Sequence, residues 1–365
     1  MCPLLLDEAE YVPDLIDLTK DEEARKYWLD CFEKTINTYE KQCIKSYPNT
    51  EVSIKKANDF KQSYLRKLSE LKASPFAFGK LTVRSLLDLR EHCMSQFEFF
   101  DVYSNEKRDE NRLGLELLLD RCEFVESLET VDKRWHELFK GFLAGNVYDY
   151  GAQAFIQKQS KGHLDKFNQA LNSIDDRFLS DENDLEIINR LKESYYKCIC
   201  VFVDNSGFDI TLGVLPLVFF ILKSSPETRV ILCANSKPAI NDITTIELMF
   251  LIKKLAVLMP EISEAYTTKR LVVIETGSAS PCLDLSRINI DLAKLMETSQ
   301  VDLVVLEGMG RSIHTNYNAK FKCDSLKAAV LKNQWLANRF GFSDFNSEDK
   351  KFPIVFKYEK CTKRS

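Results

Sequence analysis

Oxygen-bearing side chains follow directly after the apolar stretch 198–203, which reads CICVFV. They are Asp204, Asn205 and Ser206, and Asp209 lies a few residues further along the chain. A continuous apolar run with β-branched and aromatic residues is typical of a buried strand, so we expect a strand that delivers a carboxylate and an amide to a turn. Ligands bind at the carboxyl ends of the strands in open α/β sheets. This turn is therefore the first candidate site.

Polar side chains recur after four other strand-like stretches, at 229–234, 270–275, 301–306 and 352–356. Because the carboxyl ends of parallel strands meet at one edge of a sheet, we expect these side chains to gather near Asp204. The residues in question are Asn235, Asp242, Glu307, Gly308, Gly310, Arg311 and Lys357.

The carboxylates, amides and cations at this edge suit a divalent cation beside an anion. Asp204, Asn205 and Asp242 offer hard oxygen ligands for the cation. Arg311 can grip a phosphate with its planar fork, and Lys357 can act as a point charge. A bound metal would polarise a phosphoryl oxygen and orient or activate a nucleophile. The pattern therefore predicts metal-assisted chemistry on a phosphate group.

Simpler structural roles stay open for several of these residues. An Asp or Asn after a strand is most often a helix cap or a turn former. Asp242 could therefore cap the following helix, and capping is favoured for Asp209. Glu307 could form a structural ion pair with Arg311. His314 is the histidine nearest to the predicted edge in sequence, and we assign it no role.

The glycines near this edge do not belong to a common nucleotide-binding motif. Gly207, Gly308 and Gly310 would allow backbone N–H groups to approach an anion. However, the dinucleotide fingerprint G-x-G-x-x-G is absent after every predicted strand. The phosphate loop G-x-x-x-x-G-K-[ST] and the nucleophile elbow G-x-S-x-G are absent as well.

We divide the chain into two domains by its pattern. Residues 1–195 are mainly helical in pattern, whereas strand-like and helix-like stretches alternate over residues 196–365. Near-continuous apolar strands alternating with helices predict an α/β fold whose mostly parallel sheet is covered by helices on both faces. We place the helices of the second domain at 212–223, 244–259, 285–298 and 325–340.

The segment 144–151 interrupts the helical pattern of the first domain. It contains Asn146 and Asp149 between two glycines. A structural turn is the simpler interpretation, and a loop that faces the site is the alternative.

The composition excludes several classes of protein. There are 50 Lys and Arg against 55 Asp and Glu, so no basic excess is available to neutralise a nucleic acid. No apolar run reaches the length of a membrane span, and the first residues lack the pattern of a signal peptide. The 11 scattered cysteines then indicate reduced thiols in a cytoplasmic protein. The oligomeric state stays open.

Several segments together resemble one protein family. EGMGR at 307–311, DNSGFD at 204–209 and NSKPAIND at 235–242 look like the blocks of subfamily II of the metal-dependent damage-control phosphatases. The likeness is greatest to the C-terminal phosphatase domain of animal pantothenate kinase 4 proteins and to stand-alone plant members. With no kinase-like region before these blocks, the chain resembles the stand-alone form. Further segments that look like this family lie at 75–93, 144–152, 280–287 and 356–360.

The resemblance implies a hydrolase of small phosphate monoesters that uses Mn²⁺, Ni²⁺, Co²⁺ or Mg²⁺. The expected substrates are 4′-phosphopantetheine and its oxidised or otherwise damaged forms, which places the protein in metabolite damage control in coenzyme A synthesis. The family's metal ligands carry over onto Asp204, Asn205 and Asp242, and Arg311 with the glycines of EGMGR is intact. The family's helical N-terminal part beside a Rossmann-like sheet agrees with the division made above.

The hypothesis on the mechanism gives each residue a role. Arg311 and Lys357 would stabilise charge on the phosphoryl group, together with backbone N–H groups near Ser206 and Gly308. The helical domain would close over the sheet edge and shape the pocket. The residues expected to bind the substrate or its phosphate are Asn146, Asp149, Ser206, Asn235, Glu307, Gly308, Gly310, Arg311 and Lys357.

The nucleophile is left open by the sequence. Asp204 is a candidate for a nucleophile or a metal ligand, and Asp209 is a candidate general acid or base. Two other classes of protein also stay open. One is a Rossmann-like transferase such as a methyltransferase, and the other is a non-catalytic binding protein of the same fold.

Overall fold

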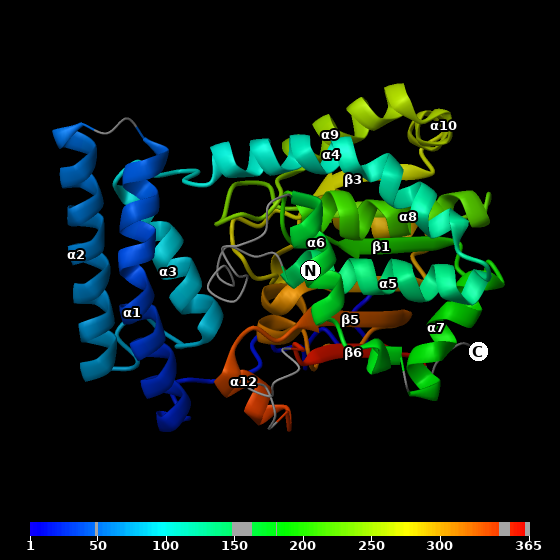
Figure 1. The fold of residues 1–365 in the computed structure, drawn as a ribbon. Coiled ribbons are helices and arrows are strands. Elements are labelled where there is room, and N and C mark those ends of the chain that lie inside the picture. Colours follow the sequence, from blue (N-terminus) through cyan, green and yellow to red (C-terminus); the bar gives the residue numbers. More distant parts are fainter. Residues whose placement is uncertain (48–49, 148–162, 180, 343–350, 362–365) are drawn as a thin grey trace.

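A six-stranded sheet lies at the centre of the computed structural model (Figure 1). The structure describes residues 1–47, 50–147, 163–179, 181–342 and 351–361. The strand order is β3-β2-β1-β4-β5-β6, with all neighbours parallel except β5 and β6. The prediction of an α/β fold with a mostly parallel sheet is confirmed. The strands are β1 (Cys198–Phe202), β2 (Arg229–Ala234), β3 (Leu271–Glu275), β4 (Leu303–Glu307), β5 (Asp324–Val330) and β6 (Ile354–Glu359).

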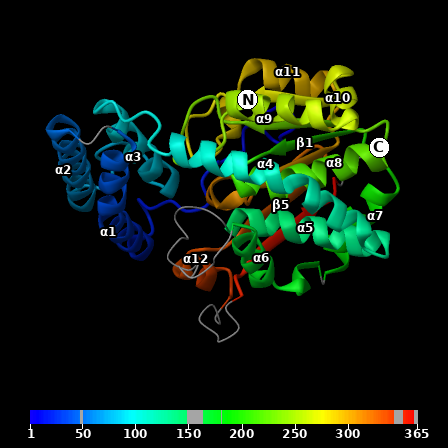
Figure 2. The same cartoon turned by 45° about the horizontal axis from the view of Figure 1, so that its top comes forward.

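Helices cover both faces of the sheet (Figure 2). Side chains alternate along β1, so Ile199 and Val201 pack on one face and Cys198 and Cys200 on the other. The second face is covered by α11 (Ile290–Thr298), the turn η4 (Leu285–Arg287) and the N-terminal segment. The first face is covered by α4 (Ser104–Ser127), α5 (Val131–Val147), α6 (His163–Ser173), η2 (Asp176–Leu179), α7 (Glu182–Lys192), α8 (Leu215–Ser224), α9 (Thr245–Leu258) and α10 (Pro260–Thr267).

Strand β5 is a correction to the sequence analysis. The pattern predicts a helix over 325–340, but the first part of this stretch belongs to β5, and helix α12 spans only Gln334–Arg339. Ala, Lys and Leu favour a helix locally, yet every residue of β5 is buried in the sheet. Lys327 tolerates this burial because its Nζ donates to Ala319 O at 2.6 Å and to Glu359 Oε2 at 2.7 Å. Packing between β4 and β6 therefore overrides the local helix propensity.

Strand β6 also differs from the prediction, because it is longer and runs antiparallel to β5. Lys357 consequently lies within the strand, opposite Lys327, instead of following the strand at its end. Its Nζ pairs with Glu359 at 3.2 Å and lies 4.5 Å from the centre of the Tyr317 ring. The antiparallel direction thus commits Lys357 to contacts along the β5–β6 edge.

Two of the loops at the carboxyl edge lead into π-helical turns. The turn η3 (Asp209–Val214) follows the loop after β1, and the turn η5 (Met309–Thr315) follows β4. The helix predicted over 212–223 therefore begins earlier, at Asp209. Such turns are rare and often occur at functional sites.

Three helices pack together at one side of the sheet (Figure 1). They are α1 (Glu22–Ser46), α2 (Glu51–Ala73) and α3 (Val83–Gln96). Their buried side chains form a core of their own, and we call residues 18–103 the three-helix unit. Helices α4 to α7 contribute to the core of the sheet instead. Residues of the predicted first domain thus belong to two cores, and the boundary at residue 195 stays a prediction. None of the helices in the described ranges is long and apolar enough to span a membrane.

Candidate active site

The loop after β1 turns at Gly207, which helix α4 holds in place. Gly207 has a φ of 77°, and its N–H donates to Asn111 Oδ1 at 2.7 Å. A Cβ at this position would lie 2.4 Å from Glu110 Oε2. Glycine is therefore required both by the backbone conformation and by the close approach of α4. Sequence reasoning missed Asn111, because a helix so far before β1 carries no local signal of this contact.

Arg311 lies at the centre of the polar residues that gather at the carboxyl edge. It is 1% exposed, and its Nη1 donates to Asp204 Oδ1. Its Nη2 donates to Asp242 Oδ2 at 2.8 Å and to Asn235 Oδ1 at 3.1 Å. Burial alone would lower the pKa of Arg311, but the charges of Asp242 and Asp204 raise it above its ordinary value. The structure thus brings together residues from the ends of β1, β2 and β4.

The two glycines of EGMGR are explained by close packing. Gly308 has a φ of 85°, and a Cβ there would lie 2.2 Å from Asp204 Oδ2. A Cβ at Gly310 would lie 1.9 Å from the carbonyl oxygen of Pro281. Both positions exclude a side chain whether or not a ligand is bound. Anion binding by their backbone N–H groups stays a prediction.

Asp242 does not cap helix α9, so this simpler role is excluded. Thr244 is the cap, because its Oγ1 accepts from Glu247 N at 3.3 Å. The Oδ2 atom of Asp242 accepts instead from Arg311 and from Asn235 Nδ2, the latter at 3.0 Å. Asp242 is therefore directed into the cluster.

Asp209 also points into the cluster, so the favoured capping role is wrong. Its Oδ2 accepts from Asn205 Nδ2 at 2.8 Å and from Asn205 N at 3.2 Å. The carboxyl groups of Asp209 and Glu307 face each other within hydrogen-bonding reach. Burial and the charge of Asp204 raise the pKa of Asp209 to about 6. Burial and the charge of Asp209 raise the pKa of Glu307 well above its usual value. The pair can therefore share a proton near neutral pH.

Asn146 reaches the cluster from the end of α5. Its Nδ2 donates to Asp204 Oδ2 at 2.9 Å and to Asp209 Oδ2 at 3.4 Å. Of the segment 144–151, the structure therefore places Asn146, a residue of α5, at the site. Asp149 lies outside the described residues. His314, which was left without a role, is buried against the three-helix unit, with its ring centre 5.3 Å from that of Trp28.

Lys332 is a cation that sequence reasoning missed. It follows β5, whose carboxyl end lies at the same edge as those of β1 and β4. Its charge acts on Asp209 and opposes the rise in the pKa of that carboxyl group. The signal was the apolar stretch AVL directly before Lys332. It was hidden because residues 325–340 resemble a helix.

The charge of the cluster fits a bound cation. Four buried carboxyl groups, those of Asp204, Asp209, Asp242 and Glu307, gather around Arg311. Even when Asp209 and Glu307 share one proton, the combined negative charge of the four carboxyl groups exceeds the positive charge of Arg311. Buried charge without compensation is unfavourable. A divalent cation on the predicted ligands would supply the compensation.

Several buried side-chain oxygen atoms of the cluster also have unfilled hydrogen-bonding capacity. Among the residues whose positions are described, no group donates to Asn146 Oδ1, and none donates to Asp209 Oδ1 or Glu307 Oε1 apart from the proton that Asp209 and Glu307 can share. Ser206 Oγ is likewise buried with no hydrogen-bond partner in that part of the chain. Buried polar atoms without partners are uncommon and often mark the position of a water, an ion or a substrate.

The predicted metal ligands are the carboxylates of Asp204 and Asp242 and the amide of Asn205. Hydrogen bonds connect these three side chains to one another, in part through Arg311. Asn205 Nδ2 donates to Asp204 Oδ2 at 3.0 Å, and Arg311 bridges Asp204 to Asp242. Over the described ranges, no three His, Cys, Asp or Glu side chains are arranged to hold a metal ion. The oxygens that suit a hard cation therefore lie in one cluster, and their coordination of a metal stays a prediction.

A mostly parallel sheet, with oxygen-bearing side chains and a buried arginine at its carboxyl edge, defines an α/β protein whose site suits a cation and an anion. The chain belongs to the family described as the damage-control phosphatase ARMT1-like domain, which matches residues 29–345. This family is metal-dependent. The family resemblance of the EGMGR, DNSGFD and NSKPAIND blocks is thus confirmed.

Three curated proteins show the extent of the similarity. The 4′-phosphopantetheine phosphatase of Mus musculus is 39% identical over 408 residues, which cover 99% of this chain and 48% of that protein. Pantothenate kinase 2 of Arabidopsis thaliana is 34% identical, with 92% of this chain and 40% of that protein covered. The chain therefore spans less than half the length of these two relatives. Damage-control phosphatase At2g17340 of Arabidopsis thaliana is 31% identical, with 86% of this chain and 84% of that protein covered.

The fold is also similar to a solved structure. A DUF89 family protein from Pyrococcus horikoshii matches with a TM-score of 0.61 and 15% sequence identity. The match covers 92% of this chain and 98% of that one. At this identity the likeness supports the fold.

Proposed function

We propose that this protein is a metal-dependent phosphatase that hydrolyses small phosphate monoesters. The observation that carries the proposal is the contact of Arg311 with Asp204, Asp242 and Asn235. It joins a cation suited to phosphate with the predicted metal ligands in one buried cluster. Membership of the damage-control phosphatase family supports this reaction class.

The substrates we propose are 4′-phosphopantetheine and its oxidised or otherwise damaged forms. The mouse relative that bears the name of this activity matches nearly all of the chain. The protein would then act in metabolite damage control in coenzyme A synthesis, in the cytoplasm. Its partner is a small phosphorylated metabolite, and the net charge of −5 offers no basis for binding a nucleic acid.

Asp204, Asn205 and Asp242 would hold the metal, which is Mn²⁺, Ni²⁺, Co²⁺ or Mg²⁺. When bound, the metal supplies Lewis-acid polarisation of a phosphoryl oxygen. Both carboxylate oxygens of Asp204 already accept hydrogen bonds, from Arg311 and from Asn146. We assign Asp204 to the ligand set and propose that water is the nucleophile.

The reaction breaks the bond between phosphorus and the ester oxygen and forms a bond from phosphorus to the oxygen of water. Arg311 stabilises the negative charge that develops on the phosphoryl oxygens. Asp209, whose pKa of about 6 lies near neutrality, exchanges the proton that it shares with Glu307. It can take a proton from water or give one to the leaving alcohol.

The remaining phosphate contacts come from the same edge. The unpartnered Ser206 Oγ can donate to a phosphate oxygen, and so can the backbone N–H of Gly308. Lys332 replaces Lys357 as the lysine of the site, because β5 ends at this edge and Lys357 is committed to Glu359. The two lysines form a matched pair for a test.

Phosphate release from 4′-phosphopantetheine tests the proposal directly. We expect release with at least one of the four metals, loss of release with a chelator, and loss with Asp204→Ala. Lys332→Ala should lower the rate about tenfold, because a charge-assisted contact contributes about 1.5 kcal/mol, whereas Lys357→Ala should leave it unchanged. Release that survives both the chelator and Asp204→Ala overturns the metal mechanism. Thermal stabilisation by S-adenosylmethionine without metal would favour the transferase alternative.

A further inference from the structure

The three-helix unit contacts the loops that follow four strands of the sheet. These loops lie at the same edge as the candidate active site. The contacts join Glu91 to Ile240 after β2, Asp88 to Ser280 after β3, Trp28 to His314 after β4, and Tyr27 to Asn333 after β5. A unit with its own hydrophobic core therefore touches the backbone segments that carry the site.

The contact at Ile240 is distinguished by its backbone conformation. Ile240 has a φ of 48°, which lies in the left-handed region. This region is strongly disfavoured for a β-branched residue and persists only where the surroundings impose it. Asp242, a predicted metal ligand, follows two residues later.

The surroundings that impose this conformation belong to the three-helix unit. The Ile240 side chain packs against the core of the unit, and its N–H donates to the carboxylate of Glu91 on α3. Glu91 is in turn fixed by Arg90, whose Nε and Nη2 donate to Glu91 Oε1 at 3.0 and 2.8 Å. Arg90 is buried, and its Nη1 donates to Tyr39 OH at 2.6 Å. A hydrogen-bonded chain thus runs from α1 through α3 to the loop.

The residues directly after Ile240 engage the loop that follows β1. The carbonyl oxygen of Asn241 accepts from Ser206 N at 2.9 Å. Asn205 and Asp242 form an isolated antiparallel bridge. A change in the backbone at Ile240 would therefore displace Asp242 relative to Asn205, its partner in the proposed ligand set.

We propose that Glu91 is a positioning residue, through which the three-helix unit holds Ile240 in its left-handed conformation and so places Asp242 for metal binding. The inference rests on the proposed function, because it uses the assignment of Asp242 as a metal ligand. It predicts that Glu91, which is not a metal ligand and belongs to the three-helix unit with its separate hydrophobic core, influences the affinity for the metal.

Direct binding of Mn²⁺, measured by the electron paramagnetic resonance signal of the free ion, tests this role without an activity assay. We expect Glu91→Ala to bind Mn²⁺ about tenfold more weakly, at the low end of what loss of an outer-shell partner causes. Glu91→Gln keeps an oxygen that can accept from Ile240 N–H, so it should bind Mn²⁺ more tightly than Glu91→Ala. Glu33→Ala is the matched control, because it removes a carboxylate that pairs with Lys72 on the exposed side of the same unit.

A rescue variant separates positioning from general destabilisation. Ile240→Gly relieves the conformational restriction, because glycine adopts a positive φ readily. Glu91→Ala combined with Ile240→Gly should therefore regain most of the affinity that Glu91→Ala loses. Hydrogen exchange of the segment 236–242, measured without metal, should be faster in Glu91→Ala than in Glu33→Ala.

The outcomes are distinguishable. Mn²⁺ affinity and exchange in Glu91→Ala that equal those of the unsubstituted chain overturn the inference, as does an equal loss in Glu33→Ala. Binding of Mn²⁺ without phosphate release by the unsubstituted chain overturns the proposed substrate, and the affinities still decide the role of Glu91. If the unsubstituted chain does not bind Mn²⁺, the same variants are compared with Co²⁺, Ni²⁺ and Mg²⁺ by calorimetry; if none of the four metals binds, the metal assignment fails, and this inference fails with it.

Discussion

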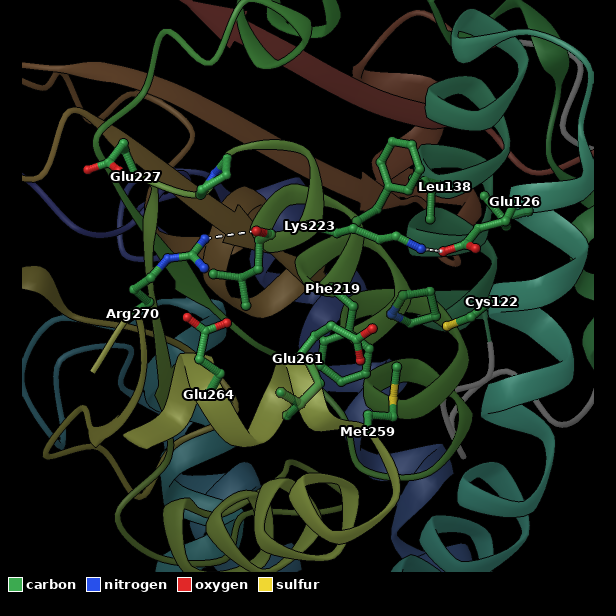
Figure 3. Close-up of a pocket in the computed structure, with 16 residues that line it drawn as sticks. Cys122, Glu126, Leu138, Phe219, Lys223, Glu227, Met259, Glu261, Glu264 and Arg270 are labelled. Atoms are coloured by element: carbon green, nitrogen blue, oxygen red, sulfur yellow. Dashed lines mark hydrogen bonds and ion pairs between the residues drawn. The ribbon is translucent and has the colours of Figure 1, made fainter. Parts of the chain in front are cut away.

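The carboxyl edge of the sheet and a cavity beside α8 are two regions with opposite properties. The cavity has a volume of 440 Å³ and lies between α4, α8 and α10 (Figure 3). Apolar side chains such as Phe219 and Met259 line it. Some of its charged groups have local partners, since Lys223 pairs with Glu126 at 2.5 Å and Arg270 donates to backbone carbonyl groups. At the carboxyl edge, by contrast, charged side chains are almost completely buried and bind one another.

The two regions differ in how the charges of their side chains are compensated. The side chains of Lys223 and Glu126 are 56% and 46% exposed, so water compensates their charges. Arg311 and Glu307 are 1% and 0% exposed, so only neighbouring groups or a ligand can do so. Buried titratable groups with shifted pKa values concentrate at functional sites. The carboxyl edge is therefore the better candidate for the functional site.

Of the substitutions that distinguish the carboxyl edge from the cavity, Gly308→Ala is expected to have the largest effect on stability and on phosphate release. The new Cβ would meet Asp204 Oδ2 at 2.2 Å, and the backbone would be held at a φ of 85°. Strain and overpacking together should cost about 3 kcal/mol of unfolding free energy, and phosphate release should fall roughly 100-fold because Asp204 is displaced. Urea unfolding and the phosphate assay measure the two effects.

Gly79→Ala is the matched control for this substitution. Gly79 has a φ of 91°, and a Cβ added there would meet no heavy atom of the described residues within 4 Å. It should therefore show only the conformational cost, about 1 kcal/mol, with phosphate release unchanged. Equal losses of activity in the two variants would contradict the steric account of the EGMGR glycine.

A smaller loss of stability is expected when the pH falls, because of His314, which lies where the three-helix unit contacts the carboxyl edge. Burial lowers the pKa of His314 from 6.5 to about 4, against the opposing charge of Asp14. The unfolded chain therefore takes up a proton at a higher pH than the folded chain does. Stability is complete above about pH 6.5 and falls as the pH drops toward about 4. We expect a loss of about 2 kcal/mol between about pH 7 and about pH 5.

Urea unfolding at both pH values measures this loss, and His314→Gln provides the comparison. The substitution removes the titrating group, so the pH dependence of the unfolding free energy should decrease by the same amount. An unchanged dependence would show that other buried groups, such as the carboxyl pair at the edge, dominate the response to acid.

Sequence reasoning located the edge because the strands that build it are apolar over their whole length. The predicted strands at 198–203, 229–234 and 270–275 agree with β1, β2 and β3 to within one residue at either end. Because β1 and β2 are parallel, the loops that carry Asp204 and Asp242 lie at the same carboxyl edge, where the two segments meet. The gathering of the central residues follows from two facts that the sequence contains, the strand pattern and the polar residues after each strand.

The remaining features depend on contacts that leave no local pattern. Lys327 makes β5 resemble an amphipathic helix, and only its buried partners permit a strand there. That error hid Lys332 and left Lys357 as the apparent lysine of the edge. Asn111 and Glu91 contact the site loops from helices that are distant in sequence. No periodicity in those helices distinguishes these two side chains from other polar residues.

The smallest effects on stability and on phosphate release are expected from substitutions at the cavity. Lys223→Ala, Glu126→Ala and the double variant form a double-mutant cycle for the pair that borders it. Because both side chains are substantially exposed, the coupling free energy should be about 0.5 kcal/mol or less. Phosphate release should not change in any of the three variants, since neither side chain contacts the cluster around Arg311. A marked fall in phosphate release at unchanged stability would mean that the cavity communicates with the edge, and the two regions would then have to be treated as one functional unit.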